Sequence, residues 1–142
     1  MTVSVVPHIN LRGQARTALQ FYQSVFGGEI MAMTYHDAHA VRDLQDADRL
    51  MWGQVRATDG FQVMAYDVPT DTAWQPGENA YFVCVGCSTA AEASERWARL
   101  AAGATVIQPL APAPWAPLYG MLKDKFGVIW VINVSAAPAA AS

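Results

Sequence analysis

The sequence has few charged side chains and no run of charge of one sign. Of its 142 residues, 15% are charged and 53% are hydrophobic, and the formal net charge is −3. Such a chain is not intrinsically disordered, because disorder requires low hydrophobicity and high net charge. It also lacks the basic cluster that binding to nucleic acid requires. We therefore expect a folded protein that has no nucleic-acid partner.

Long hydrophobic runs and a cysteine framework are missing as well. No apolar stretch reaches the roughly 20 residues that span a bilayer, and the start of the sequence does not resemble a signal peptide. Cys84 and Cys87 are too few for a disulfide framework. We expect a cytoplasmic protein without a membrane partner. The surplus of apolar residues indicates a ligand cavity, a subunit interface or both.

The sequence contains an internal repeat, which is clearest in two predicted helices. Residues 14–26 and residues 90–102 each carry apolar side chains at helical spacing, at an offset of about 75 residues from Ala15 to Ala90. Thr89 is a suitable N-cap for the second helix, and Glu92 completes a capping box. Gly27 and Gly103 follow the two helices and favour their termination.

Strand signals surround both helices in the same order. One strand precedes each helix and three follow it, so that each half is predicted to be β-α-β-β-β. The Asp59-Gly60 pair indicates a tight hairpin, and residues 124–127 form a second turn. The predicted strands are residues 3–10, 29–35, 50–58 and 61–68 in the first half and 80–86, 105–110, 118–123 and 128–134 in the second.

This pattern predicts an α+β fold of two β-α-β-β-β repeats. We expect curved antiparallel sheets whose concave faces surround a cleft, with the helices outside, because pairing the repeats buries both concave faces. The predicted domain spans residues 1–134, with repeats at 1–68 and 79–134 and a linker at 69–78. Residues 135–142 are predicted to be a flexible tail. Residues 36–49 are an insertion that the second repeat lacks, predicted as a short helix or a lid.

Two groups of motifs resemble a known family. The first is Pro7-His8-Ile9-Asn10-Leu11-Arg12-Gly13 followed by Phe21-Tyr22-Gln23-Ser24-Val25-Phe26-Gly27-Gly28, and the second is Tyr119-Gly120-Met121 followed by Asp124-Lys125-Phe126-Gly127-Val128-Ile129-Trp130. They resemble the vicinal oxygen chelate superfamily, which includes glyoxalase I, extradiol dioxygenases and bleomycin-resistance proteins. Within it, the motifs look most like the PhnB-like, 3-demethylubiquinone methyltransferase-like branch. One fold of this kind supports many chemistries.

The resemblance implies where a metal ion would bind. Enzymes of this superfamily hold one divalent metal through His and Glu side chains on the first and last strands of each unit. Those positions correspond here to Pro7, Met64, Phe82 (or Tyr81) and Val131. Proline and valine have no donor atoms, and methionine is a poor ligand for Mg, Mn or Ni. We therefore expect no metal and no other cofactor.

Other candidate ligands favour structural interpretations. Strand alternation places Val5, Pro7 and Ile9 on one face, so that His8 would point toward the helix layer if the apolar face lined the cleft. We interpret His8 as a hydrogen-bonded structural histidine, His36 and His39 as part of a solvated loop, and the two cysteines as reduced thiols. Asp67 and Asp124, at strand ends, are predicted to serve turns.

The predicted ligand site consists of aromatic, sulfur and amide side chains. Trp52, Gln54 and Arg56 share one strand face, and Trp115 lies in a proline-rich run ahead of Tyr119. Flat aromatic rings stack on planar ligands, and methionine adapts to irregular ones. With the side chains at the implied metal positions, the predicted ligand-binding residues are Trp52, Gln54, Arg56, Met64, Phe82, Trp115, Tyr119 and Val131.

Three functions are compatible with these residues. The favoured hypothesis is a homodimeric PhnB-like protein that binds a small hydrophobic or planar molecule in an apolar cleft, without the family's metal site. This hypothesis favours a non-enzymatic protein and leaves open a lyase or dioxygenase activity of the vicinal oxygen chelate type. The second is a metal-dependent lyase, isomerase or dioxygenase of the same superfamily. The third is a dimerising scaffold with no ligand.

Overall fold

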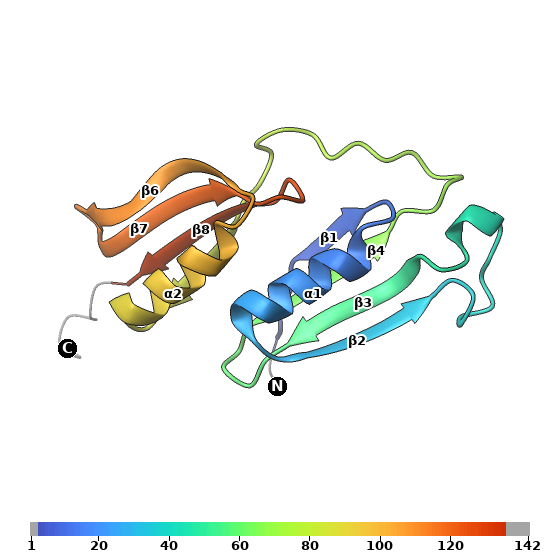
Figure 1. Cartoon of the computed structure of the whole chain (residues 1–142), viewed down its shortest axis with the longest axis horizontal. Helices are drawn as coiled ribbons and strands as arrows, with labels where there is room; N and C mark the ends of the chain where they lie inside the picture. The colour runs from blue at the N-terminus through green and yellow to red at the C-terminus, as the bar shows by residue number, and fades with distance from the viewer. Residues whose placement is uncertain (1–2, 136–142) are drawn as a thin grey trace. The chain divides into compact units, whose positions relative to one another are not determined.

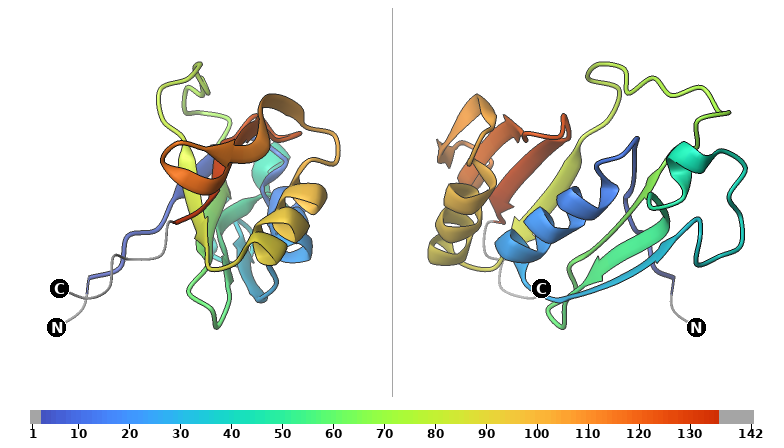
Figure 2. Two further views of the ribbon diagram at one scale, coloured as in Figure 1. Left: turned by 90° about the vertical axis from the view of Figure 1, so that its left-hand side faces the viewer. Right: turned by 45° about the vertical axis from the view of Figure 1, so that its right-hand side comes forward.

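The protein consists of two compact units that share one architecture. A computed structural model describes residues 3–135 and divides into Met1–Gly77 and Glu78–Ser142. Each unit contains one long helix on one face of a four-stranded sheet (Figures 1 and 2). The predicted β-α-β-β-β order is confirmed in both. The predicted tail lies outside the described residues except for Ser135. No helix within residues 3–135 is long and apolar enough to cross a membrane.

The sheet of the first unit is mixed. Its elements are β1 (His8–Leu11), α1 (Ala15–Phe26), β2 (Glu29–Thr34), β3 (Leu50–Arg56) and β4 (Gln62–Asp67), and the strands lie in the order β1-β4-β3-β2. β1 pairs with β4 in parallel, and the other two pairs are antiparallel. The prediction of purely antiparallel sheets is corrected in this respect. Because α1 carries the chain back between β1 and β2, two hairpin reversals give β4 the direction of β1.

α1 forms where the sequence predicts it. Its buried side chains are those of the amphipathic pattern, Ala15, Ala18, Leu19, Tyr22, Val25 and Phe26. It ends at Gly27, whose φ of 78° is readily adopted by a residue without a Cβ atom. At its N-terminus, the N-cap residue Gln14 makes no side-chain hydrogen bond to the helix. The first N–H groups of α1 therefore need a partner from elsewhere.

The insertion between β2 and β3 contains only a short helix. Residues Leu44–Asp46 form a 3-10 turn, and the Asp43 carboxylate accepts a hydrogen bond of 2.9 Å from the backbone N–H of Gln45. The following hairpin has the predicted Asp59-Gly60 turn, in which Gly60 has a φ of 104° and the Phe61 N–H donates to the Asp59 carboxylate.

The second unit repeats this arrangement. Its elements are β5 (Val83–Cys87), α2 (Ala90–Leu100), β6 (Thr105–Ala113), β7 (Ala116–Lys123) and β8 (Ile129–Val134), in the sheet order β5-β8-β7-β6, with β5 and β8 parallel. The Thr89 hydroxyl accepts a hydrogen bond from the Glu92 N–H, which confirms the predicted N-cap. β6 continues past Pro109 because it is an edge strand, where a missing N–H leaves no partner unpaired.

Asp124 forms the predicted turn before β8. Its carboxylate accepts hydrogen bonds from the backbone N–H groups of Phe126 and Val128, at 2.8 and 3.0 Å. Its other oxygen accepts a hydrogen bond of 2.9 Å from the indole N–H of Trp130, which is fully buried. One buried carboxylate therefore connects the turn to the core of the second unit.

Each helix packs so closely on its sheet that a glycine lies beneath it. A Cβ atom at Gly53 would approach the Leu19 side chain to 2.5 Å, and one at Gly120 would approach the Trp97 ring to 2.8 Å and the Leu110 Cα to 2.9 Å. Gly53 and Gly120 therefore mark the helix-covered faces. A Cβ at Gly86 in β5 would meet only the Asn133 amide oxygen, at an ordinary 3.5 Å.

We predict that Gly120→Ala destabilises the protein by about 1–3 kcal/mol, since neither the indole ring nor the backbone at Leu110 can yield easily. The matched control is Gly86→Ala, in the same sheet, which should change the free energy of unfolding by less than about 0.5 kcal/mol. Urea denaturation followed by circular dichroism measures both. Equal effects of the two substitutions would contradict this packing.

Candidate functional site

The face of the first sheet that lies opposite α1 carries all four predicted ligand-binding residues of this unit. Along β3 and β4, burial alternates so that Val55, Val63 and Ala65 are fully buried. The side chains between them belong to the opposite face, which we call the open face of the first sheet. It includes Trp52, Gln54, Arg56 and Met64, as the sequence parity predicts for the first three.

One row of side chains crosses all four strands of this open face. His8 in β1 is paired with Met64 in β4, Met64 with Gln54 in β3, and Gln54 with Met31 in β2. Directly paired residues of a sheet point to the same side. The row therefore places an imidazole, a thioether, an amide and a second thioether side by side.

The structure corrects the predicted orientation of His8. Ile9 and Leu11 are each 4% exposed and face the core, whereas His8 and Asn10 are exposed and lie on the open face. The residue that pairs with Met64 is thus His8 rather than Pro7. In the second unit, the residue that pairs with Val131 is Cys84 rather than Phe82, which precedes β5.

The repeat offset does not transfer from the helices to the strands, because the two units have loops of unequal length. Three residues separate β1 from α1, whereas Ser88 and Thr89 alone separate β5 from α2. An offset of 75 residues that aligns the helices therefore maps His8 to Val83, whereas the residue at the same place in the second sheet is Cys84. The choice of Pro7 instead of His8 is a separate error of one residue within the first strand, and such a slip exchanges the two faces of a strand. The alternation of Ile9 and Leu11 with His8 and Asn10 is the signal that indicates the correct face.

His8 is held in a defined orientation. Its Nδ1 lies 2.8 Å from the Oδ1 of Asn10, and its ring meets the Tyr66 ring edge-on at a centroid distance of 5.2 Å. Tyr66 also belongs to the open face, because it is paired with Asn10. Neither Asn10 nor Tyr66 is among the site residues that the sequence predicts.

The amide of Gln54 takes part in a short polar chain. The Gln62 side-chain N–H₂ donates to the Gln54 Oε1 at 3.2 Å, and the Gln54 N–H₂ donates to the Met31 sulfur at 3.7 Å. Arg56 is exposed and forms no ion pair among the side chains of residues 3–135. These donors lie at the end of the open face nearest the β3–β4 hairpin.

A pocket of about 900 Å³ opens beside these donors. It is lined by Gln54 and Arg56, by Met31 and Glu29 of β2, and by the hairpin that follows β3. The Phe26 and Phe61 rings stack at its border, at 4.0 Å between centroids. Two predicted site residues therefore share one pocket of the first unit.

The second unit brings together a different subset of the predicted residues. Trp115 and Tyr119 meet edge-on at 5.2 Å and line a pocket of about 390 Å³ with Ile107, Gln108 and Met121. Trp115 is 64% exposed in the turn between β6 and β7. Phe82 is 40% exposed and Val131 is 8% exposed, and neither lines this pocket.

A buried carboxylate at the end of β4 connects this strand to the start of α1 and to β3. Asp67 is 2% exposed, and one of its oxygens accepts hydrogen bonds from the N–H groups of Gly13 and Ala15, at 2.6 and 3.0 Å. The other accepts from the Leu50 N–H at 2.9 Å. Asp67 thus supplies the partner that Gln14 does not give to the start of α1, and it does more than serve a turn.

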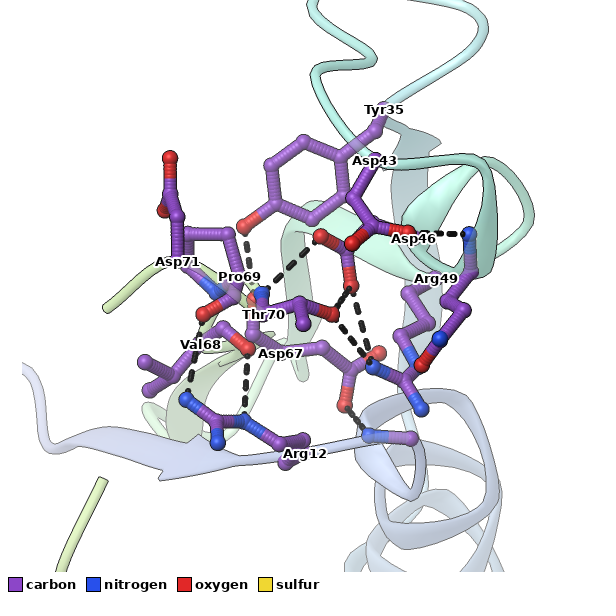
Figure 3. Close-up of polar contacts among 12 residues, drawn as sticks. Arg12, Tyr35, Asp43, Asp46, Arg49, Asp67, Val68, Pro69, Thr70 and Asp71 are labelled. Carbon is purple, nitrogen blue, oxygen red and sulfur yellow. Dashed lines mark hydrogen bonds and ion pairs between the residues drawn. The ribbon is translucent and has the colours of Figure 1, made fainter. Parts of the chain in front are cut away.

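Around Asp67, polar contacts fasten the segment after β4 to the first unit. The Arg12 guanidinium donates to the carbonyl oxygens of Val68, Pro69 and Thr72. The indole N–H of Trp74 donates to the Asn10 carbonyl at 3.0 Å. The first part of the predicted linker is therefore bound to its own unit (Figure 3).

Asp46 connects the insertion to the same segment. It is 2% exposed and accepts hydrogen bonds from the N–H and the hydroxyl of Thr70, at 2.9 and 2.8 Å, and from Arg49 at 3.0 Å. Burial alone would raise the pKa of Asp46, but these hydrogen bonds outweigh it and the pKa lies below its ordinary value. Nearby, burial and next the Tyr66 hydroxyl raise the pKa of Tyr35, whose hydroxyl donates to the Asp67 carbonyl.

No metal centre is evident among the described residues. Within residues 3–135, no three His, Cys, Asp or Glu side chains are grouped so that they could hold an ion. His36 and His39 lie exposed in the insertion, and the nearby Asp37 carboxylate accepts a hydrogen bond from the Thr34 N–H. Cys87 is buried. Cys84 is exposed as a residue, but its sulfur is partly covered, and this partial burial raises the pKa of the Cys84 thiol.

Comparisons with known proteins agree with the resemblance in the motifs. The family model described as 3-demethylubiquinone-9 3-methyltransferase matches residues 3–133. Protein YjdN of Escherichia coli (strain K12) is 26% identical over 136 residues, which cover 90% of this chain and 92% of YjdN.

Two solved structures establish the fold. Protein PA1353 from Pseudomonas aeruginosa superposes with a TM-score of 0.84 and 29% identity, over 94% of this chain and 98% of PA1353. A glyoxalase/bleomycin resistance protein/dioxygenase domain from Frankia sp. EAN1pec superposes with a TM-score of 0.66 at 12% identity, over 98% of this chain and 96% of that domain. The predicted glyoxalase/bleomycin-resistance-like α+β fold is confirmed.

We predict that Asp46→Asn destabilises the protein by about 1–3 kcal/mol at neutral pH, because it leaves Arg49 and Thr70 without their charged partner. A carboxyl whose pKa is lowered by folding stabilises the native state above its unfolded pKa, and this contribution is lost as the pH falls through the folded value. The difference from the unsubstituted protein should therefore shrink below about pH 4.

Urea denaturation at a series of pH values measures this difference. Asp71→Asn is the control, since Asp71 lies in the same segment but is half exposed in its ion pair with Arg42. A difference for Asp46→Asn that did not change with pH would show that the charge of Asp46 is not what stabilises the segment.

Proposed function

Since the chain belongs to the 3-demethylubiquinone-9 3-methyltransferase family, whose model matches nearly all of it, and has the glyoxalase/bleomycin-resistance-like fold, we propose that it binds a small planar or hydrophobic molecule. The single observation that carries the proposal is the composition of the open face of the first sheet. There, Trp52, Met64 and Gln54 are half-buried side chains of one sheet face opposite α1.

The roles of these side chains follow from their chemistry. The Trp52 indole offers a flat surface for stacking, and the thioether of Met64 adapts to the shape of an apolar ligand. Gln54 and Arg56 supply hydrogen-bond donors that orient the ligand at the edge of the 900 Å³ pocket. Binding thus uses burial and stacking for affinity and a few polar groups for orientation.

The second unit contributes its own binding surface in this proposal. Trp115 and Tyr119 form an aromatic corner in a pocket of about 390 Å³, a size suited to one small ring system. Phe82 remains a proposed ligand contact because its ring is 40% exposed directly before β5, and Val131 because it is paired with Cys84 and Met121 across the second sheet. The proposed protein acts in the cytoplasm and needs no cofactor.

The proposal does not include the metal ion of the vicinal oxygen chelate superfamily. The residues paired across the first and last strands are His8 with Met64 and Cys84 with Val131. Valine has no donor, and thioether and thiol sulfur are soft ligands rather than the His and Glu set that suits Mg, Mn or Ni. The donor set therefore does not fit the family's metal.

We also propose that the protein is a homodimer. Apolar side chains are exposed on both edge strands that follow a helix, with Met31 at 58% in β2 and Val106 and Ile107 each at 47% in β6. Exposed edges of this kind are usually covered in folded proteins. Light scattering that gives the mass of one chain would reject the dimer.

The ligand proposal is tested with 7-methoxycoumarin, a planar bicyclic probe, by equilibrium dialysis. We expect saturable binding of about one probe to the open face of the first sheet and about tenfold weaker binding by Trp52→Ala, which removes the stacking surface. Leu44→Ala is the control, because Leu44 is apolar and 88% exposed in the insertion. Absence of saturable binding, or equal binding by Trp52→Ala, would reject the proposed site and favour the scaffold hypothesis.

Metal analysis separates this function from a metal-dependent lyase, isomerase or dioxygenase. Protein purified without a chelator should contain well below one equivalent of Mn, Ni, Zn or Fe per chain, because the paired positions carry the donors described above. About one tightly held ion per chain, lost on dialysis against chelator together with activity, would establish the enzymatic alternative.

A further inference from the structure

The open face of the first sheet presents a hydrogen-bond acceptor and a group of donors at separate places. The acceptor is His8, at the β1 edge of the row that continues through Met64 and Gln54. The donors are on β3 and β4, where Gln54, Gln62 and Arg56 lie together. Two strand spacings separate β1 from β3, which is about 10 Å.

The hydrogen bond between His8 and Asn10 decides which nitrogen of the imidazole is free. The Asn10 Oδ1 lies 2.8 Å from Nδ1, and in this arrangement the amide oxygen accepts the hydrogen bond and Nδ1 carries the proton. In the neutral ring, Nε2 is then an acceptor. Nε2 makes no hydrogen bond to any of residues 3–135.

The side chain of His8 does not contribute to the hydrophobic core. Ile9 and Leu11 provide the burial of β1, and His8 is exposed on the other side of the strand. The Tyr66 ring, in edge contact with the imidazole, restricts its rotation. An imidazole that is fixed on two sides and open at Nε2 is suited to bind an O–H or N–H group.

At the β3 and β4 end of the row, hydrogen bonds orient the side-chain amide of Gln54. The Oε1 of Gln54 is occupied by the Gln62 N–H₂, and one N–H of Gln54 is directed to the Met31 sulfur. The remaining N–H groups of Gln54 and Gln62 and the guanidinium of Arg56 can donate to a carbonyl or other acceptor. Between the two ends lies the thioether of Met64, which contacts apolar surface.

From this arrangement we infer that His8 is a ligand-binding residue and that the ligand class is a planar aromatic compound with an O–H or N–H group at one end. The hydroxyl donates to His8 Nε2, the ring system lies over Met64, and an acceptor at the far end of the ligand meets the donors of β3 and β4. The inference rests on the proposed function and specifies its ligand class. About 10 Å between the two polar ends fits a bicyclic ring system with its substituents.

The test compares 7-hydroxycoumarin with 7-methoxycoumarin, in which a methyl group replaces the hydroxyl hydrogen. Both compounds carry a carbonyl group at the other end of the ring system. Equilibrium dialysis at neutral pH should give about fivefold tighter binding of the hydroxyl compound by the unsubstituted protein, the contribution of one hydrogen bond. His8→Leu should reduce this ratio to about one while leaving the affinity for 7-methoxycoumarin within about twofold.

Three further variants test whether the preference for the hydroxyl compound comes from His8 and its contact with Asn10. His8→Gln, which retains an acceptor oxygen, should keep part of the preference for the hydroxyl compound. Asn10→Ala, which removes the partner of Nδ1, should lower the preference without abolishing it. His36→Leu is the matched control, because His36 is an exposed histidine of the insertion and should leave the ratio at about five. Urea denaturation of each variant confirms that it is folded.

The outcomes separate the two proposals. If both coumarins bind but the unsubstituted protein does not distinguish them, or if His8→Leu retains the preference, the role of His8 is rejected and the proposed function stands. If neither coumarin binds, the proposed function is rejected and the inference about His8 falls with it.

Discussion

The architecture of the first unit depends on one buried carboxylate. Asp67, at the end of β4, accepts hydrogen bonds from Gly13 and Ala15 before and within α1 and from Leu50 at the start of β3. Its negative charge lies at the N-terminus of α1, where the helix dipole favours it. A buried charge is stable only when such partners surround it. Three segments that are distant in sequence are thereby held at one end of the sheet.

This constraint determines which side chains are available for binding. With α1 fixed over Val55, Val63 and Ala65, the alternating residues of β3 and β4 are left on the opposite face. β1, joined to β4 in parallel, then adds His8 and Asn10 to that face. The candidate site is therefore a consequence of how the helix and the first strand are attached, and the chemistry follows from the residues that alternate with the core.

The two units keep the same scaffold but differ in the chemistry of their open faces. In the first, the row across the sheet is His8, Met64, Gln54 and Met31, and in the second it is Cys84, Val131, Met121 and Gln108. Amides and thioethers recur in both rows at exchanged positions, whereas the imidazole has no counterpart. The two units therefore share a backbone arrangement, whereas the side chains on their open faces differ.

The sequence by itself determined the two helices, most strand positions, both turns and the shared face of Trp52, Gln54 and Arg56, because periodicity, capping and turn residues are local properties. It did not determine that β1 pairs in parallel, or that His8 shares a face with Met64. Those features depend on how β1 pairs with β4, and the offset between the repeats is no guide to it, because the unequal loops before α1 and α2 change that offset by one residue. Only the tertiary structure decides register, because it arises from hydrogen bonds between segments that are distant in sequence.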